Sequence, residues 1–70
     1  MEVKDKIYDL FKDIKNGIYI ECGANDGITQ SNTLELEKNN DWVGILIEPS
    51  VNAFNKCLLN RSEKNIFINT

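Results

Sequence analysis

The sequence predicts an α/β fold, a parallel three-stranded sheet with flanking helices, on two observations. Segments with helical periodicity alternate with short apolar segments of strand length along the 70 residues. Each connection between two predicted strands is also long enough for the right-handed crossover that joins parallel strands. Alternation of this kind is typical of a parallel sheet with helices on its faces. We therefore expect the order helix, strand, helix, strand, helix, strand.

The first predicted element is an amphipathic helix over residues 1–16. Its apolar positions recur at helical spacing, so they share one face that is expected to pack in the core. Asn16 and Gly17 follow, and both residue types tolerate the left-handed conformation that ends many helices. The predicted core face consists of Val3, Ile7, Leu10, Phe11 and Ile14.

The first strand is predicted at residues 18–22, which are rich in β-branched and aromatic side chains. It ends in the glycine-containing loop of residues 23–27. A short second helix follows, with Asn32 as its N-cap and Glu35 three positions later, as in a capping box. Asn39 and Asn40 are expected to close this helix.

A second strand is predicted at residues 42–47, a nearly continuous apolar run. This pattern is typical of a strand covered on both faces in a parallel sheet. Pro49 prevents further ladder pairing, and Ser50 is a suitable N-cap for a third helix. Residues 66–68 are predicted as the third strand. The apolar face of the third helix consists of Val51, Phe54, Cys57 and Leu58.

Composition excludes several classes of function. The net charge is −3, and the eight basic residues are dispersed among eleven acidic ones, which argues against a nucleic-acid partner. No apolar run approaches the roughly 20 residues of a membrane span, and the N-terminus lacks a signal-peptide pattern, so we expect a cytoplasmic protein. The chain has no His, and Cys22 and Cys57 lack metal-ligand spacing. Both cysteines are therefore expected to be buried and reduced, with no metal site.

Two features fall at the predicted carboxyl ends of strands, where open α/β sheets bind their ligands. The pattern Glu21-x-Gly23-x-x-x-Gly27 spans the end of the first strand and its loop, and Glu48 ends the second strand. Glycines let a loop backbone approach a ligand closely. A strand-end carboxylate can accept hydrogen bonds from both hydroxyls of a ribose. The sequence thus predicts a site for a cofactor that contains adenosine.

The glycine spacing indicates which cofactor this is. Dinucleotide-binding folds use G-x-G-x-x-G, and here Asn25 occupies the position of the second glycine. The acidic residues Glu21 and Asp26 would repel phosphates, but they suit the sulfonium and ammonium groups of S-adenosylmethionine. The pattern therefore favours S-adenosylmethionine over NAD, and an NAD-dependent dehydrogenase is the less favoured alternative.

Three sequence stretches together resemble the N-terminal part of FkbM-type methyltransferases. They are YIECGANDG at residues 19–27, SNT at residues 31–33 and WVGILIEP at residues 42–49. The resemblance covers residues 17–70 and implies the class I methyltransferase fold, which is Rossmann-like. Residues 1–70 would then be a single partial domain, its N-terminal half, with a leading helix at 1–16 and a cofactor-binding βαβαβ unit at 17–70.

The resemblance also implies S-adenosylmethionine as cofactor and O-methylation of a hydroxyl on a sugar or related small metabolite. The substrate pocket and any catalytic base would come from segments that follow these motifs. Asp26, by its charge, and Ser31, as a secondary contact, complete the predicted site. The resemblance itself assigns Glu48 to the ribose, and to the methionine and ribose side Glu21, Gly23, Ala24, Asn25 and Gly27.

Structural roles and a second function stand beside this hypothesis. Glu21 also suits a helix-cap partner, Gly23 and Gly27 suit plain turns, and Glu48 suits the start of a turn at Pro49. The alternative function is a non-catalytic truncated remnant or association module with no cofactor binding, since only the cofactor-binding half is recognised. The edge of the first strand would lack the neighbour that pairs with it in the family, and an unpaired apolar strand is a template for self-association.

Overall fold

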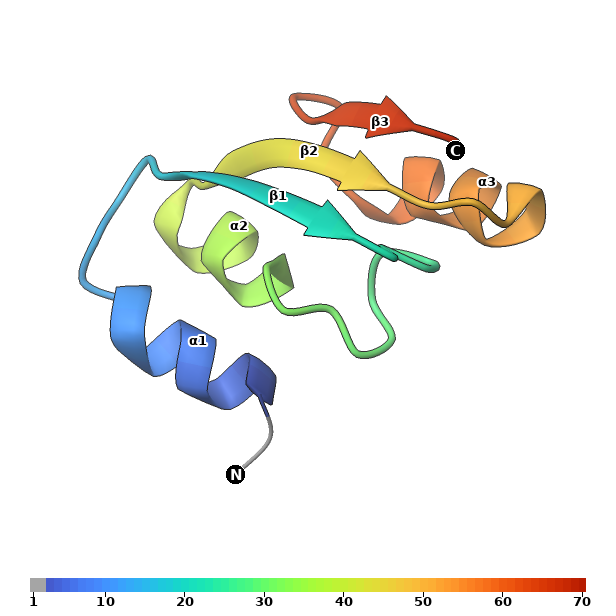
Figure 1. Ribbon diagram of the computed structural model, residues 1–70. Helices are drawn as coiled ribbons and strands as arrows, with labels where there is room; N and C mark the ends of the chain where they lie inside the picture. Colours follow the sequence, from blue (N-terminus) through green and yellow to red (C-terminus); the bar gives the residue numbers. More distant parts are fainter. Residues whose placement is uncertain (1–2) are drawn as a thin grey trace.

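The computed structural model describes residues 3–70 and contains three helices and three strands in alternation. The elements are α1 (Val3–Phe11), β1 (Ile18–Cys22), α2 (Leu34–Asn40), β2 (Val43–Ile47), α3 (Val51–Asn60) and β3 (Ile66–Ile68). The strands form one parallel sheet in the order β1-β2-β3 (Figure 1). The predicted α/β class and element order are therefore confirmed, while residues 1–2 of the expected leading helix lie outside the described residues.

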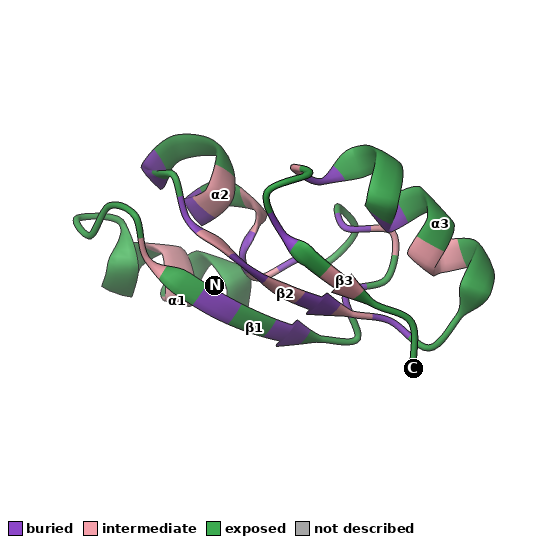
Figure 2. Cartoon of the chain, turned by 90° about the horizontal axis from the view of Figure 1, so that it is seen from above, coloured by how far each residue is buried: buried purple, intermediate pink, exposed green. Residues whose placement is uncertain are grey.

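Strand register sorts the side chains onto two faces of the sheet. β1 and β2 pair along their whole length, with Ile18 opposite Val43 and Cys22 opposite Ile47, and Ile45 lies opposite Ile66 of β3. Successive side chains of a strand point to opposite faces. Figure 2 shows the result along β1, where exposed and buried residues alternate. The two faces of the sheet are therefore buried to different extents.

One face of the sheet is covered by helices, and the core lies there. α2 and α3 lie on the same side of the sheet, and α1 lies beside α2 (Figure 1). The rings of Phe54 on α3 and Phe67 on β3 meet edge to face, with centroids 6.5 Å apart. The buried apolar residues are Tyr19, Ala24, Leu36, Trp42, Leu46 and Cys57.

The opposite face, which we call the open face, is apolar and is covered by no helix of residues 3–70. Ile18 on it is 78% exposed and Ile20 is 67% exposed. Two predictions fail here. β2 is covered on one face only, and Cys22 is exposed rather than buried, whereas the burial expected for Cys57 is confirmed. The register places on the open face Ile18, Ile20, Cys22, Val43, Ile45, Ile47, Ile66 and Ile68.

α1 ends at Phe11, well before the predicted boundary at Asn16. The helix ends at Phe11 because the carbonyls of the residues that follow accept hydrogen bonds from side chains elsewhere in the chain. The Trp42 indole N–H donates to the carbonyl of Ile14 at 2.7 Å, and the side-chain amide of Asn40 donates to the carbonyl of Lys12. The predicted core face is confirmed only in part, because Ile7 is half-buried and packs against the core. The other four residues of that face, Val3, Leu10, Phe11 and Ile14, are exposed. Trp42 is the packing residue at this place, in edge contact with the ring of Phe11 at 5.8 Å.

The helix caps are partly as predicted. Ser50 caps α3, where its hydroxyl accepts a hydrogen bond from the N–H of Ala53 at 3.3 Å. The cap predicted for α2 is wrong, because Thr33 rather than Asn32 occupies the N-cap position and its side chain makes no capping bond. Within residues 3–70, no helix has the length and apolar content required to cross a bilayer.

Candidate functional site

Glu48 joins the loops that follow β1 and β2. Its side chain is buried, although it stands directly after the last residue of β2. One carboxylate oxygen accepts a hydrogen bond from the backbone N–H of Asn25 at 2.6 Å, and the other accepts from the N–H of Ser50 at 2.8 Å. The carboxyl ends of two neighbouring parallel strands therefore meet at this carboxylate, which is where open α/β sheets bind ligands.

The backbone of the glycine loop turns sharply at the end of β1. The N–H groups of Gly23 and Ala24 both donate to the carbonyl of Ile47, at 2.8 and 2.9 Å, and the Ala24 side chain is buried. Gly23 has a φ of +73°, which strains any residue with a side chain. A Cβ at Gly23 would meet no atom within 4 Å. The space beside Gly23 is therefore open to a ligand.

Asp26 closes the next turn of the loop. Its carboxylate accepts from the N–H groups of Ile28 and Thr29, at 2.9 and 2.7 Å, and from the Thr29 hydroxyl at 2.8 Å. These hydrogen bonds, the one from Ile28 foremost, lower the pKa of Asp26. Asp26 is thus a carboxylate at neutral pH, and it adds a negative charge to the outside of the loop.

Glu21 is buried on the helix-covered side of the sheet. One of its oxygens accepts from the hydroxyls of Ser31, at 3.2 Å, and of Thr33. Ser31 also accepts from the N–H of Leu34 at 3.1 Å, the first residue of α2. Glu21 and Ser31 therefore fix the entry of α2, which is the structural role that the sequence left open, and their contacts with a cofactor stay predictions.

Arg61 is the residue of this site that sequence reasoning missed. It is the C-cap residue of α3, and its side chain has no exposed area. The guanidinium donates to the carbonyl of Gly27 at 3.0 Å and to the hydroxyl of Ser31 at 3.1 Å. It also donates to the hydroxyls of Tyr19 and Thr33, at 2.9 and 3.1 Å. Arg61 thus connects the glycine loop, the entry of α2 and the middle of β1.

Glu37 on α2 balances the charge of Arg61. Its Oε1 lies 2.9 Å from Nη2 of Arg61 and accepts from Nε at 3.1 Å. The N–H of Ser62 and the side-chain amide of Asn65 also donate to Glu37, at 3.0 and 2.7 Å. Burial by itself raises the pKa of Glu37, but these hydrogen bonds, with Arg61 first, outweigh it and lower the pKa overall. Glu37 is therefore a carboxylate at neutral pH.

Asn65 ties this polar network to the centre of the sheet. Its side-chain oxygen accepts from the N–H of Gly44 on β2 and from the Tyr19 hydroxyl, both at 2.8 Å. Burial raises the pKa of Tyr19, so its hydroxyl stays protonated. The helix-covered side of the sheet is thus fixed by a connected set of polar groups, each with a partner.

Gly27 packs directly against Arg61. Its φ is +86°, and a Cβ there would lie 2.6 Å from Cγ of Arg61 and 3.2 Å from Sγ of Cys57. A glycine at this position is therefore required by packing as well as by backbone conformation. Its predicted role in close approach to a ligand stays a prediction.

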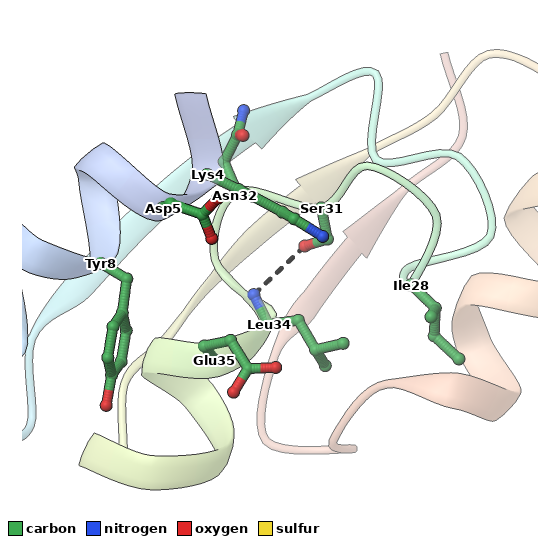
Figure 3. Close-up of a pocket in the computed structure, with 8 residues that line it drawn as sticks. All are labelled: Lys4, Asp5, Tyr8, Ile28, Ser31, Asn32, Leu34 and Glu35. Carbon is green, nitrogen blue, oxygen red and sulfur yellow. Dashed lines mark hydrogen bonds between the residues drawn. The ribbon is translucent and has the colours of Figure 1, made fainter. Parts of the chain in front are cut away.

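A hollow of about 330 Å³ lies between α1 and the start of α2. Figure 3 shows Asp5 and Tyr8 of α1 on one side and Leu34 and Glu35 of α2 on the other. Ser31 is the only predicted site residue in its lining, which does not include the strand-end groups Gly23, Asn25 and Glu48. The hollow is therefore separate from the strand-end site. Its lining residues are Lys4, Asp5, Tyr8, Ile28, Ser31, Asn32, Leu34 and Glu35.

Comparisons with known proteins give no relative for this chain. No protein-family model, curated protein or solved structure matches it. The function must therefore be argued from the geometry of the site and from the motifs within it.

Proposed function

We propose that this chain is the S-adenosylmethionine-binding part of an FkbM-type methyltransferase with the class I, Rossmann-like fold. The cofactor supplies an activated methyl group, and the acceptor is a hydroxyl of a sugar or related small metabolite in the cytoplasm. The contact of Glu48 with the N–H of Asn25 at 2.6 Å carries the proposal. It joins the GANDG and IEP motifs, on which the family resemblance depends, at one point of the fold.

The carboxylate of Glu48 fits a ribose. A carboxylate has about four acceptor positions, and backbone N–H groups occupy one on each oxygen of Glu48. Acceptor capacity therefore remains for the two hydroxyls of a ribose. Because Glu48 is only 7% exposed, water competes little for these positions, and charge-assisted hydrogen bonds are strong there.

The loop after β1 fits the remainder of the cofactor. The space beside Gly23 is open, so a ligand can lie against the backbone there. Any other residue at this position would fill that space with its side chain. The negative charge of Asp26 favours the cationic methionine portion of S-adenosylmethionine over the phosphates of NAD. In this proposal the chain contributes binding and orientation of the methyl donor.

Calorimetric titration of the folded chain with S-adenosylmethionine, and separately with NAD, tests the proposal. Circular dichroism first establishes that the chain is folded. We expect saturable binding of S-adenosylmethionine and none of NAD. Glu48→Gln should weaken binding at least tenfold, because the amide keeps the shape but removes the charge that favours the diol. Glu63→Gln, at an exposed position, is the matched control.

Two outcomes would contradict the proposal. A folded chain that binds neither cofactor rejects the function, and a Glu48→Gln variant that binds like the parent rejects the site. Gly23→Ala tests the loop, because the added methyl enters the open space at a strained φ. Gly27→Val is a poor test, since its side chain would collide with Arg61 and disturb the fold.

The open face favours a second candidate function, association with a second copy of this chain. The open face has eight apolar side chains. A fully exposed side chain of this size loses about 100 Å² of accessible apolar area when it is buried. Because these eight are already partly buried, a second copy could cover on the order of 400 Å² on each partner. A stable interface typically buries about 800 Å² per partner. Face-to-face packing would therefore give a weak dimer whose population depends on concentration.

Sedimentation velocity across a range of concentrations tests this second function. We expect the weight-average mass to rise with concentration, and Ile20→Lys, in the middle of the open face, to keep the chain monomeric. Lys64→Met, at an exposed position outside the open face, is the control and should associate like the parent. A mass that stays at the monomer value at every concentration would rule out the association.

A further inference from the structure

The Arg61 side chain is fully buried and donates to five different residues, although Arg61 follows the last turn of α3. Nε donates to Glu37, Nη1 donates to Gly27 and Ser31, and Nη2 donates to Tyr19 and Thr33. The guanidinium has five donors in a rigid planar fork, which equals the number of these hydrogen bonds, and Nη2 also lies 2.9 Å from Oε1 of Glu37. A lysine at this position has three donors on one nitrogen and cannot reproduce the arrangement.

Two of these contacts bracket the second half of the loop between β1 and α2. Gly27 and Ser31 lie at the two ends of the segment 27–31, and a single nitrogen of Arg61 donates to both, at 3.0 and 3.1 Å. Within this segment the backbone makes a bond from the N–H of Ser31 to the carbonyl of Ile28 at 3.2 Å. Other side-chain contacts of the segment are with Asp26, which lies next to it in the loop, and from Ser31 to Glu21 of β1. Arg61 is therefore the residue that ties both ends of the segment to α3.

The other half of the loop is attached through different groups. Residues 23–25 are held by the carbonyl of Ile47 and the carboxylate of Glu48. The two halves meet at Gly27, whose N–H donates to the carbonyl of Ala24 at 3.0 Å. The shape of the glycine loop is thus set from both ends, by Glu48 at the strand edge and by Arg61 beneath it.

We infer that Arg61 is a positioning residue for the cofactor loop: it holds residues 27–31 in the conformation that binds S-adenosylmethionine, without touching the cofactor itself. This inference rests on the proposed function. A loop that must be ordered on binding costs affinity, and a loop that is ordered beforehand does not. The charge of Arg61 is neutralised by Glu37, so the contribution of Arg61 is the geometry of its fork and not its field.

Arg61→Lys tests the inference with two measurements. Amide hydrogen exchange of the cofactor-free chain compares the N–H of Ser31 in the loop with that of Leu46 in β2, and calorimetry gives the dissociation constant for S-adenosylmethionine. We expect exchange at Ser31 to rise at least tenfold while Leu46 stays protected, and the dissociation constant to rise at least tenfold. Lys64→Met, an exposed cation close in sequence, is the control and should change neither.

Parallel loss of protection at Ser31 and Leu46, with unchanged affinity of the folded fraction, would show that Arg61 only stabilises the fold and would overturn the inference. If Arg61→Lys does not fold, the paired variant Arg61→Met with Glu37→Met replaces it, since apolar replacement of a whole buried ion pair is often tolerated. If the parent chain binds no S-adenosylmethionine, the proposed function is rejected. A selective rise in exchange at Ser31 in the variant would still show that Arg61 orders residues 27–31.

Discussion

The two faces of the sheet are built from the same three strands but differ in the kind of interaction that they make. On the helix-covered face, Tyr19 and Leu46 pack among helices, and Arg61 and Glu37 form a buried ion pair. The open face presents only apolar side chains, of which Ile18 and Ile20 are mostly exposed. One face is therefore specified by directional bonds between particular residues, and the other is specified only by its hydrophobicity.

This difference shows where stability and function are expected to reside. Burial of apolar area is non-directional, so many partners would suit the open face. The polar network on the other face accepts only one arrangement, because each donor there has a defined acceptor. We therefore expect substitutions to have large effects on the covered face and small ones on the open face.

The largest effect is expected at the ion pair. Glu37→Ala leaves Arg61 buried without its partner, and breaking a buried pair in this way typically costs about 3–5 kcal/mol of the free energy of unfolding. Glu63→Ala, at an exposed position, should change it by less than about 0.5 kcal/mol. Urea denaturation followed by circular dichroism measures both, and equal midpoints for the two variants would contradict the role of the pair.

A smaller effect is expected for apolar truncation on the two faces. Leu46→Ala removes a side chain with no exposed area and should cost about 2–5 kcal/mol. Ile20→Ala removes a side chain that is 67% exposed and should cost less than about 1 kcal/mol in the monomer. The same denaturation experiment at low protein concentration compares them. A large cost for Ile20→Ala would mean that the open face is covered in solution.

The smallest effect on stability is expected when the pH is lowered. The folded pKa values of Glu37 and Asp26 are lowered, so both groups stabilise the fold above their unfolded pKa, near 4. This stability is lost as the pH falls through the folded values. The thermal midpoint should therefore decrease below about pH 4.5. Glu37→Gln should show a shallower decrease, and an identical pH profile for the parent and this variant would contradict the assignment.

Sequence periodicity was sufficient for the strands, their order and the cap at Ser50. Strand-length apolar runs and a hydroxyl before a helix are local signals, and local signals determined these features. The end of α1 was misplaced because Trp42 and Asn40, which are distant in sequence, bind the carbonyls of Ile14 and Lys12. No pattern within α1 indicates that competition.

The site residues at the strand ends could be predicted from the sequence, but Arg61, which packs against the glycine loop, could not. Glu48 stood out because a strand-end carboxylate has a position that topology alone defines. Arg61 did not stand out in the sequence, because its acceptors come from β1, the glycine loop and α2. A polar residue after a helix is also ordinarily solvated. The exclusion of a Cβ at Gly27 by Arg61 is likewise a three-dimensional property.

The polar network also has a consequence for the synthesis of this chain on the ribosome. Two of the groups that contact the Tyr19 hydroxyl, Arg61 and Asn65, follow Tyr19 by 42 and 46 residues. The ion pair of Arg61 and Glu37 and the contacts of Asn65 with β1 and β2 can therefore form only after residues 61–65 have left the exit tunnel. We expect the nascent chain to stay unfolded until then and to fold in one late step, so that a version ending at residue 60 would remain unfolded.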